Sequence, residues 1–294
     1  MDTLKRVSKV FESAEEVLFD DSSKIIIMSD CHRGDGSWAD DFARNQHIYF
    51  YALLYYFNRG YSYIELGDGD ELWENSDMTE IVQTHSHVFW LLSRFYNEGR
   101  LYFIYGNHDI VKRSQRFVEK KLWNYYDEAL KRHVPLFKNI KFHEGLILKH
   151  KVSGKKILLL HGHQGDLIND TLWILARFLV RYLWRPLNVF GIKDPTRAAK
   201  NYNKKKAVRE RLTKCVEKEK HILVAGHSHK PSFPELGEAA YFNDGSCVHP
   251  RCITGIEIID GYIMLIKWNV KTKDDGTMYI AREILAGPRR LNDY

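Results

Sequence analysis

The chain has 294 residues, 44% of them hydrophobic, and a formal net charge of +6. A chain of this length can bury a full core, and we expect one large domain, residues 1–294, that carries an insertion. The first 23 residues lack the continuous apolar core of a signal peptide, and the four cysteines, at 31, 215, 247 and 252, show no disulfide framework. Secretion is therefore not indicated, and free thiols in the reducing cytoplasm fit best.

Short apolar runs rich in β-branched or aromatic residues predict buried strands. Five such runs lie at residues 24–28, 61–66, 101–105, 157–160 and 222–225. The longer segments between the first of them carry apolar residues at helical spacing, at 42–57, 81–95 and 117–130. Strand, loop and helix thus alternate through the first half of the chain, which predicts an α/β fold.

The C-terminal part predicts further strands. Runs at residues 255–259 and 262–268 flank Asp260-Gly261, a turn pair, and so predict a hairpin. From Lys271 on, we expect a further turn and a strand. These strands should complete a second sheet.

Each of the five predicted strands is followed at once by a block of residues with metal-ligand chemistry. The blocks are Asp30-Cys31-His32, Gly67-Asp68, Gly106-Asn107-His108-Asp109, His161-Gly162-His163 and Gly226-His227-Ser228-His229. A strand delivers its last residue to the same edge of a sheet each time, so blocks far apart in sequence can converge on one point. Any one block alone is common in turns, but the recurrence predicts one metal site.

Seven side chains in these blocks suit two divalent ions. We expect Asp30, His32 and His229 to hold one ion, Asn107, His161 and His227 to hold the other, and Asp68 to bridge them. Imidazoles accept Mn, Zn or Fe, while the carboxylate and amide oxygens keep the site hard enough for a phosphate oxygen. Two such ions lower the pKa of bound water to about 7 and can clamp both oxygens of an in-line displacement at phosphorus.

His108 follows the expected ligand Asn107 and can point at a bound phosphate. We assign it a catalytic role, either stabilising the phosphoryl charge or protonating the leaving oxygen. Asp109 is expected to orient its ring.

The order of the blocks, D-x-H, G-D, G-N-H-D, H-G-H and G-H-S-H, resembles the calcineurin-like metallophosphoesterase family over roughly residues 24–270. This resemblance implies the same seven ligands and gives His108 as the catalytic histidine. It also implies a four-layer α/β/β/α sandwich with the dinuclear centre at the sheet edge. The implied activity is hydrolysis of a phosphate ester or pyrophosphate bond.

The segment between the fourth and fifth blocks, residues 167–220, differs in composition from the rest. It carries 14 lysines and arginines against five acidic residues, a net charge of +9, whereas the remainder of the chain has −3. Because the expected ligands His161 and His227 flank it, it must lie beside the site, where an anionic substrate or surface is the natural counterpart. We interpret it as a basic, amphipathic helical cap over the metals.

The first helix of this cap, near residues 172–185, is apolar except for arginines every fourth residue, so it is unsuited to span a membrane. It can line an acyl-chain groove, rest in a lipid interface, form a dimer contact or pack on its own domain. We take Arg177 and Arg181 as substrate-binding. The basic second helix, from Thr196, nearly lacks aromatic residues that would stack on bases, so nucleic acid is not the expected partner.

Such a cap, together with Asp68-x-x-Glu71-x-Trp73, is similar to UDP-2,3-diacylglucosamine pyrophosphatases. Two blocks depart from that branch, which typically has Arg in place of His108 and His-Gly-Asp in place of His161-Gly162-His163. This resemblance implies a nucleotide-lipid substrate and peripheral membrane contact through the cap.

Two other functions compete with a hydrolase. One is a non-catalytic protein of the same fold that binds a protein partner or a membrane, and the other is a nuclease that uses the basic cap. Non-catalytic proteins of this fold lose some of the metal ligands or the histidine after Asn107, whereas this sequence has all seven expected ligands and His108. The sequence leaves the metal identity, the ester that is cut and the oligomeric state open.

Overall fold

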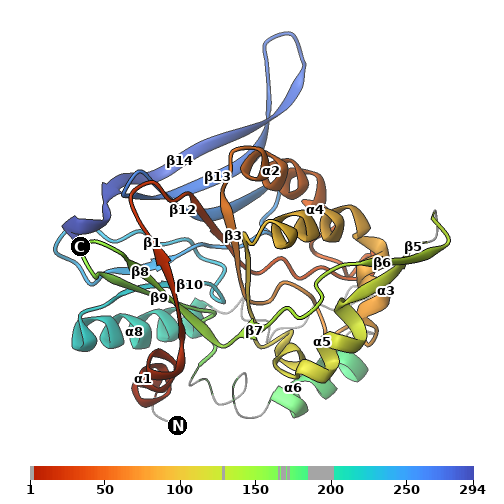
Figure 1. The fold of residues 1–294 in the computed structure, drawn as a ribbon, viewed down its shortest axis with the longest axis horizontal. Coiled ribbons are helices and arrows are strands. Elements are labelled where there is room, and N and C mark those ends of the chain that lie inside the picture. The colour runs from red at the N-terminus through yellow and green to blue at the C-terminus, as the bar shows by residue number, and fades with distance from the viewer. Residues whose placement is uncertain (1–2, 128–129, 165, 167–169, 171–172, 185–201) are drawn as a thin grey trace.

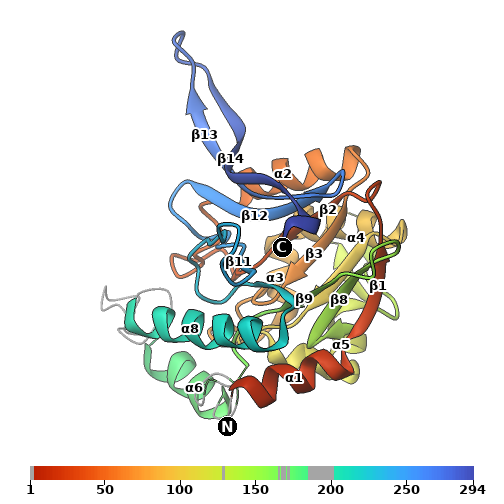
Figure 2. The same ribbon diagram turned by 90° about the vertical axis from the view of Figure 1, so that its left-hand side faces the viewer.

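The computed structural model describes residues 3–127, 130–164, 166, 170, 173–184 and 202–294. Two β-sheets stack face to face, and helices cover the outer face of each sheet (Figures 1 and 2). The expected four-layer α/β/β/α sandwich is therefore confirmed.

One sheet has seven strands. In spatial order they are β14 (Met278–Arg290), β13 (Tyr262–Thr272), β12 (Cys252–Ile259), β2 (Ile25–Met28), β3 (Ser62–Leu66), β4 (Leu101–Ile104) and β7 (Phe142–His143). Strands β2, β3, β4 and β7 run parallel, whereas β12, β13 and β14 are antiparallel. The predicted hairpin is confirmed, with Ile259 opposite Tyr262 at its turn.

The other sheet has five strands. They are β1 (Glu15–Phe19), β8 (Gly145–His150), β9 (Lys156–Leu160), β10 (Ile222–Ala225) and β11 (Tyr241–Asn243). Strands β9, β10 and β11 run parallel to one another. A separate hairpin is formed by β5 (Asn124–Asp127) and β6 (Arg132–Pro135).

Helices form the two outer layers. The seven-stranded sheet is covered by α2 (Gln46–Asn58), α3 (Met78–Thr84), α4 (Ser86–Asn97) and α5 (Gln115–Leu122). The five-stranded sheet is covered by α1 (Thr3–Ser13) and α8 (Tyr202–Glu219). Short 3₁₀ helices occur at η1 (Ile110–Arg113) and η4 (Leu291–Asp293).

Strand β2 shows why the predicted strands are continuous apolar runs. Ile25 and Ile27 pack into the core between the two sheets, whereas Ile26 and Met28 pack into the core beneath the helices. Successive side chains of a strand point to opposite faces, and here both faces are covered. All four residues are buried as a result.

Two predicted helices have different bounds in the structure. The single helix expected over 81–95 is divided into α3 and α4 at His85, whose backbone is not helical and whose buried ring hydrogen-bonds to Asp40 at 2.9 Å. The helix expected over 117–130 ends at Leu122, because the following residues pair with β6 as strand β5.

The predicted cap is only partly described, because residues 167–169, 171–172 and 185–201 lie outside the described part of the chain. Helix α6 (Trp173–Leu179) continues directly into a π-helical turn, η3 (Val180–Trp184). The second helix expected in the cap needs a correction. Its described part, α8, packs beside α1 on the five-stranded sheet through Leu212, Cys215 and Val216, so it belongs to an outer layer of the sandwich.

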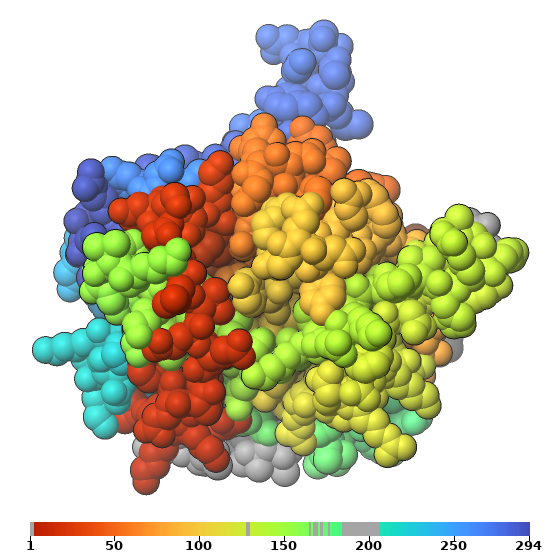
Figure 3. All heavy atoms as spheres, in the orientation of Figure 1, coloured from red at the N-terminus to blue at the C-terminus, as the bar shows by residue number. Residues whose placement is uncertain are grey.

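Strands β13 and β14 extend beyond the sheet as a two-stranded arm. The pairing of β12 with β13 ends at Asn269, and from Val270 on β13 pairs with β14 alone. The space-filling view shows this arm standing clear of the body (Figure 3). Among the helices in the described ranges, none combines the length and the apolar character that crossing a bilayer requires.

Candidate metal centre

The five ligand blocks follow β2, β3 and β4 in one sheet and β9 and β10 in the other. Backbone hydrogen bonds join neighbouring blocks beyond the ends of the strands. The amide of Asp30 donates to Gly67 at 3.0 Å, that of His32 to Asp68 at 2.9 Å, and that of Gly226 to His161 at 3.0 Å. The blocks of each sheet are thus held side by side at one edge of the sandwich.

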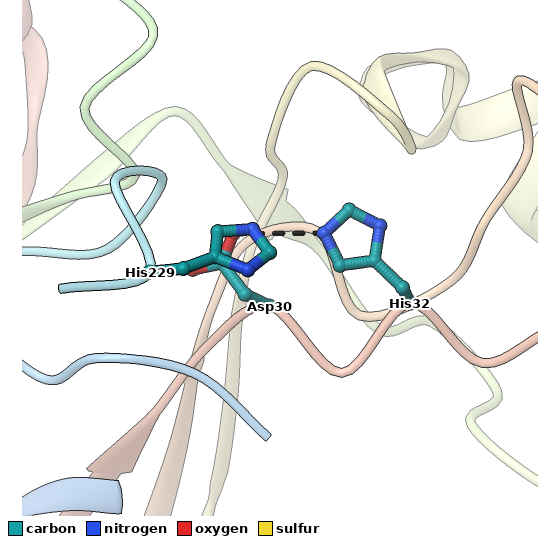
Figure 4. A group of neighbouring side chains, drawn as sticks. All are labelled: Asp30, His32 and His229. Atoms are coloured by element: carbon teal, nitrogen blue, oxygen red, sulfur yellow. Dashed lines mark ion pairs between the residues drawn. The ribbon is translucent and has the colours of Figure 1, made fainter. Parts of the chain in front are cut away.

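Asp30, His32 and His229 form a first group, with ligand atoms that all lie within 4.8 Å of one another. His229 Nε2 lies 3.0 Å from Asp30 Oδ1, and His32 Nε2 lies 3.7 Å from the same oxygen. Figure 4 shows both rings turned toward the Asp30 carboxylate. These are the three residues predicted to share one ion.

Asp68, His161 and His227 form a second group of the same size. His161 Nε2 lies 3.0 Å from Asp68 Oδ2, and His32 Nε2 of the first group lies 3.8 Å from that oxygen. Asp68 therefore faces ligand atoms of both groups, as a bridging carboxylate would. Asn107, predicted for the second ion, is buried, and its Oδ1 has no hydrogen-bond partner among the described residues.

The hydrogen bonds of these side chains favour metal binding. Among the described residues, Asp30 Oδ1, His32 Nε2 and His161 Nε2 are buried without a hydrogen bond. An unsatisfied buried polar group costs about 1–3 kcal/mol. The other polar atom of the same side chain is hydrogen-bonded to the backbone: Asp30 Oδ2 accepts from the His227 amide at 2.9 Å, and His161 Nδ1 donates to the Leu66 carbonyl at 2.8 Å. A metal ligand needs one atom fixed by the protein and the other free for the ion. The residues therefore fit two divalent cations.

The backbone is also unusual at these positions. Five of the seven predicted ligands have left-handed φ angles: Asp30 (51°), His32 (49°), Asp68 (49°), His227 (63°) and His229 (54°). Residues other than glycine seldom adopt this region, and such strain collects at functional sites. The loops therefore hold a locally unfavourable backbone that aims these side chains inward.

Burial and neighbouring charges set the protonation of the groups. Burial alone would raise the pKa of Asp68, but the charges of His161 and His108 outweigh it and hold the pKa well below its usual range. Burial, and then the charge of His161, lowers the pKa of His227 to about 4. Near neutral pH these shifts favour the Asp68 carboxylate and a neutral His227 ring, the forms that bind metals. For His161 burial lowers the pKa, but the charges of Asp68 and Asp30 outweigh it and raise the pKa to about 9, so this ring would release a proton on binding an ion.

His108 lies beside the first group and is partly exposed. Its Nδ1 hydrogen-bonds to Glu71 Oε1 at 2.7 Å, and its ring stacks on Trp73 with the centroids 4.3 Å apart and the planes 22° apart. Its backbone amide donates to Asp68 Oδ1 at 2.8 Å. Glu71, which was not among the predicted site residues, is therefore the residue that orients this ring. Its only signal in the sequence is the Asp68-x-x-Glu71-x-Trp73 spacing.

The orienting role expected of Asp109 needs a correction. Its carboxylate accepts from the amide of Gly106 at 2.7 Å and that of Gly69 at 3.2 Å, and it pairs with Lys112 at 2.8 Å. These bonds tie the loop after β4 to the loop after β3. Asp109 thus shapes the backbone around the site, while a neighbouring loop supplies the partner of the His108 ring.

A buried network of charges lies among the same loops. Arg33 pairs with Glu65 at 2.7 Å and with Asp70 at 2.7 Å, and Lys112 bonds to both Asp70 and Asp109. Burial raises the pKa of Asp70, but the charges of Arg33 and Lys112 outweigh it and lower that pKa to about 2. The network joins the loops after β2, β3 and β4 through side chains.

The two predicted substrate-binding arginines lie on α6 and η3. Arg181 donates through Nε to the carbonyl of Trp73 at 3.1 Å, and through Nη2 to those of Leu72 at 2.7 Å and Asn75 at 2.8 Å. Arg177 lies over the Trp173 ring, 5.0 Å from its centroid. Arg181 thus ties η3, and with it α6, to the turn that carries Glu71 and Trp73.

Comparison with known proteins gives a family match. A family model described as "Calcineurin-like phosphoesterase superfamily domain" matches residues 24–259. No curated protein sequence matches the chain.

Solved structures show distant similarity. Vps29 from Chaetomium thermophilum is 11% identical, with 90% of this chain and 97% of that chain covered and a TM-score of 0.40. Vps29 from Entamoeba histolytica complexed with Zn²⁺ is 18% identical, with 89% and 98% covered and a TM-score of 0.35. A protein described as a 5′-nucleotidase from Staphylococcus aureus is 14% identical, with 89% and 53% covered and a TM-score of 0.35. At these scores we infer nothing about function from the three structures.

Proposed function

The chain belongs to the calcineurin-like phosphoesterase superfamily, and on this basis we propose that it hydrolyses a phosphoric ester or pyrophosphate bond with two divalent metal ions, Mn, Zn or Fe. The main support is the convergence of two ligand groups, in which Asp30 Oδ1, His32 Nε2 and His161 Nε2 are buried and have no hydrogen-bond partner among the described residues. Asp30, His32 and His229 would hold one ion, Asn107, His161 and His227 the other, and Asp68 both. The ions, when bound, supply positive charge for the phosphate and a water of lowered pKa.

His108 acts in this proposal on the reacting phosphate. Because Glu71 occupies its Nδ1, the ring has Nε2 available. When the ring carries a proton on both nitrogens, Nε2–H can donate a hydrogen bond to a phosphoryl oxygen or pass its proton to the leaving oxygen, which leaves the ring neutral with its proton on Nδ1. The stack on Trp73 limits how the ring can turn.

The proposal is tested by metal analysis and a substrate panel. Purified protein should bind two ions per chain and cleave at least one of a simple phosphate monoester, a diester and a nucleotide-diphosphate lipid. Asp68→Ala should lose both metal and turnover, because one carboxylate serves both groups. Asp274→Ala, at the exposed tip of the arm, is the control and should behave as the wild type.

Two outcomes would contradict it. If Asp68→Ala kept both ions and its full rate, the bridging assignment would be wrong. If the wild type bound none of Mn, Zn and Fe, the hydrolase proposal itself would fail, and the alternative of a non-catalytic protein that binds a partner or a membrane would remain.

We further propose a nucleotide lipid similar to UDP-2,3-diacylglucosamine as the substrate. The support is a set of exposed large apolar side chains on α6 and η3 that acyl chains could contact. These are Ile174, Leu175, Phe178, Leu179, Tyr182 and Leu183, each 41–65% exposed. Phe178→Ser should raise KM for such a lipid and leave KM for a small ester unchanged. An unchanged KM for every nucleotide lipid tested would end this part of the proposal.

A further inference from the structure

We propose that the arm formed by β13 and β14 is a dimerisation element, which packs on the outer surface of helix α2 in a second copy of this chain. Neither the arm nor α2 contains any of the seven proposed metal ligands. The dimer is therefore independent of the proposed function and can be tested apart from it.

The arm has two unlike faces, because successive residues of a strand point to opposite sides. The register of β13 and β14 places four mainly apolar side chains on one face: Val270, Ile280, Thr272 and Met278. Met278 is 73% exposed and Val270 is 44% exposed. The opposite face carries Tyr279 and, near its base, the ion pair of Lys271 with Glu283. The arm is thus amphipathic.

The apolar face of the arm extends beyond the helix layer of its own chain. At the base of the arm this face begins with Trp268, whose ring lies 5.9 Å from that of Tyr51 and 5.0 Å from that of Tyr55, both on α2. Beyond Trp268 the arm leaves the body (Figures 2 and 3), and Val270 and Met278 are exposed. A two-stranded hairpin alone in water is marginally stable at best, and exposed apolar surface marks interaction sites.

Helix α2 offers a surface that suits this face. One stripe along its outer side, here called the α2 stripe, has a residue at every fourth position: His47, Tyr51, Tyr55 and the C-cap Arg59. Tyr51 is 47% exposed, and the Arg59 guanidinium lies over the Tyr55 ring, 3.7 Å from its centroid.

The charges of the two surfaces are complementary. Residues 44–61 include two arginines and no acidic residue, whereas residues 273–277, at the tip of the arm, include one lysine and two aspartates. An aromatic stripe of positive charge thus matches an apolar arm whose tip is negative.

A second copy is the partner because both matching surfaces belong to one chain. From His47 to Arg59 the stripe is about 18 Å long at the rise of an α-helix. From Val270 to Asp275 the arm is about 17 Å long at the rise of a strand. A twofold axis places each arm on the α2 stripe of the other copy, so both contacts form together and the assembly closes as a dimer.

Sedimentation equilibrium of the full chain tests the dimer. The wild type should have the mass of two chains. Met278→Asp should raise the dissociation constant of the dimer by roughly 10-fold or more, because it places a charge in the apolar contact. Tyr279→Asp is the matched control, since its side chain comes next on the same strand but lies on the opposite face. It should associate as the wild type does.

A mixture of two variants tests whether the arm meets α2. Tyr51→Lys should also weaken the dimer, because it changes the other half of the contact. A mixed pair of Met278→Asp and Tyr51→Lys has one unchanged contact and one in which the new charges are opposite in sign. Native mass spectrometry should therefore detect the mixed dimer above its statistical share.

Three results would overturn the proposal. They are a wild type that stays monomeric at every concentration tested, a Met278→Asp dimer as tight as that of the wild type, and a mixture without an excess of the mixed dimer. Should Met278→Asp fail to fold, Val270→Asp changes the same face and takes its place in both experiments.

Discussion

At the scale of single residues, the proposed metal ligands and His108 have separable duties. The His108 side chain contacts Glu71, Trp73 and the edge of the His32 ring, whereas the ligand atoms of the two groups face one another. His108→Gln should therefore lower kcat by about 10²–10⁴-fold, the usual contribution of a general acid, and keep the metal content of the wild type. Kinetics and metal analysis of the same preparation check both, with His133→Gln, exposed on β6, as the control. An unaltered kcat would remove His108 from the chemistry.

Gly67 shows how closely the backbone approaches a ligand. It has φ of +90°, and a Cβ placed there would lie 2.5 Å from His161 Nδ1. Gly67→Ala should therefore displace the His161 ring, destabilise the protein and weaken binding of the second ion. Gly60→Ala is a matched control, because Gly60 also has a left-handed φ, +75°, but a Cβ there meets nothing within 4 Å. It should show only the backbone cost, about 1–3 kcal/mol.

Thermal unfolding and metal titration compare the two glycine variants. The prediction is a larger loss of stability and a weaker ion affinity for Gly67→Ala than for Gly60→Ala. Equal losses, with metal affinity intact in both, would show that His161 is not held by close contact with this turn.

At the scale of elements, the segment formed by α6 and η3 holds the turn after β3 in place. Arg181 binds three carbonyls of this turn with a planar guanidinium, which the single ammonium of lysine cannot reproduce. We expect Arg181→Lys to loosen the turn, disturb the stack of Trp73 on His108 and lower kcat even for a small ester. Arg177→Lys, on the same helical segment, should leave that kcat unchanged.

Steady-state kinetics on two substrates tests this role. If Arg181→Lys raised only KM for an anionic lipid, and kcat for the small ester stayed at the wild-type value, Arg181 would be a substrate contact, as its position in the sequence first suggested. A fall in kcat on both substrates supports the role in holding the turn.

The sequence predicted those elements whose pattern is local. The run Ile25-Ile26-Ile27-Met28 carries its own evidence for a strand covered on both faces, and the blocks after the strands predicted which side chains would meet. The role of Glu71 could not be predicted, because it depends on two rings from different loops reaching one turn. The position of α8 on the five-stranded sheet could not be predicted either. Its many basic residues suggested a cap over the metals, whereas its apolar residues pack on the sheet.

At the scale of the whole molecule, the buried charges hold three strand-end loops together. Removing one partner of a buried ion pair strands the other charge, at a cost of about 3–5 kcal/mol. Lys112→Met should therefore lose stability of this order, because Asp70 and Asp109 would share one cation fewer. Denaturant unfolding measures it, and Lys120→Met, exposed on α5, is the control. Equal unfolding midpoints in the two variants would show that the network is not needed for stability.

The apolar core between the sheets contains none of the seven proposed ligands. The sandwich can therefore form by its own apolar burial while the ligand loops hold no ion. On the proposed function, ions would enter afterwards at the edge of the folded sandwich, and the metal found in purified protein would follow which of manganese, zinc and iron the growth medium supplied.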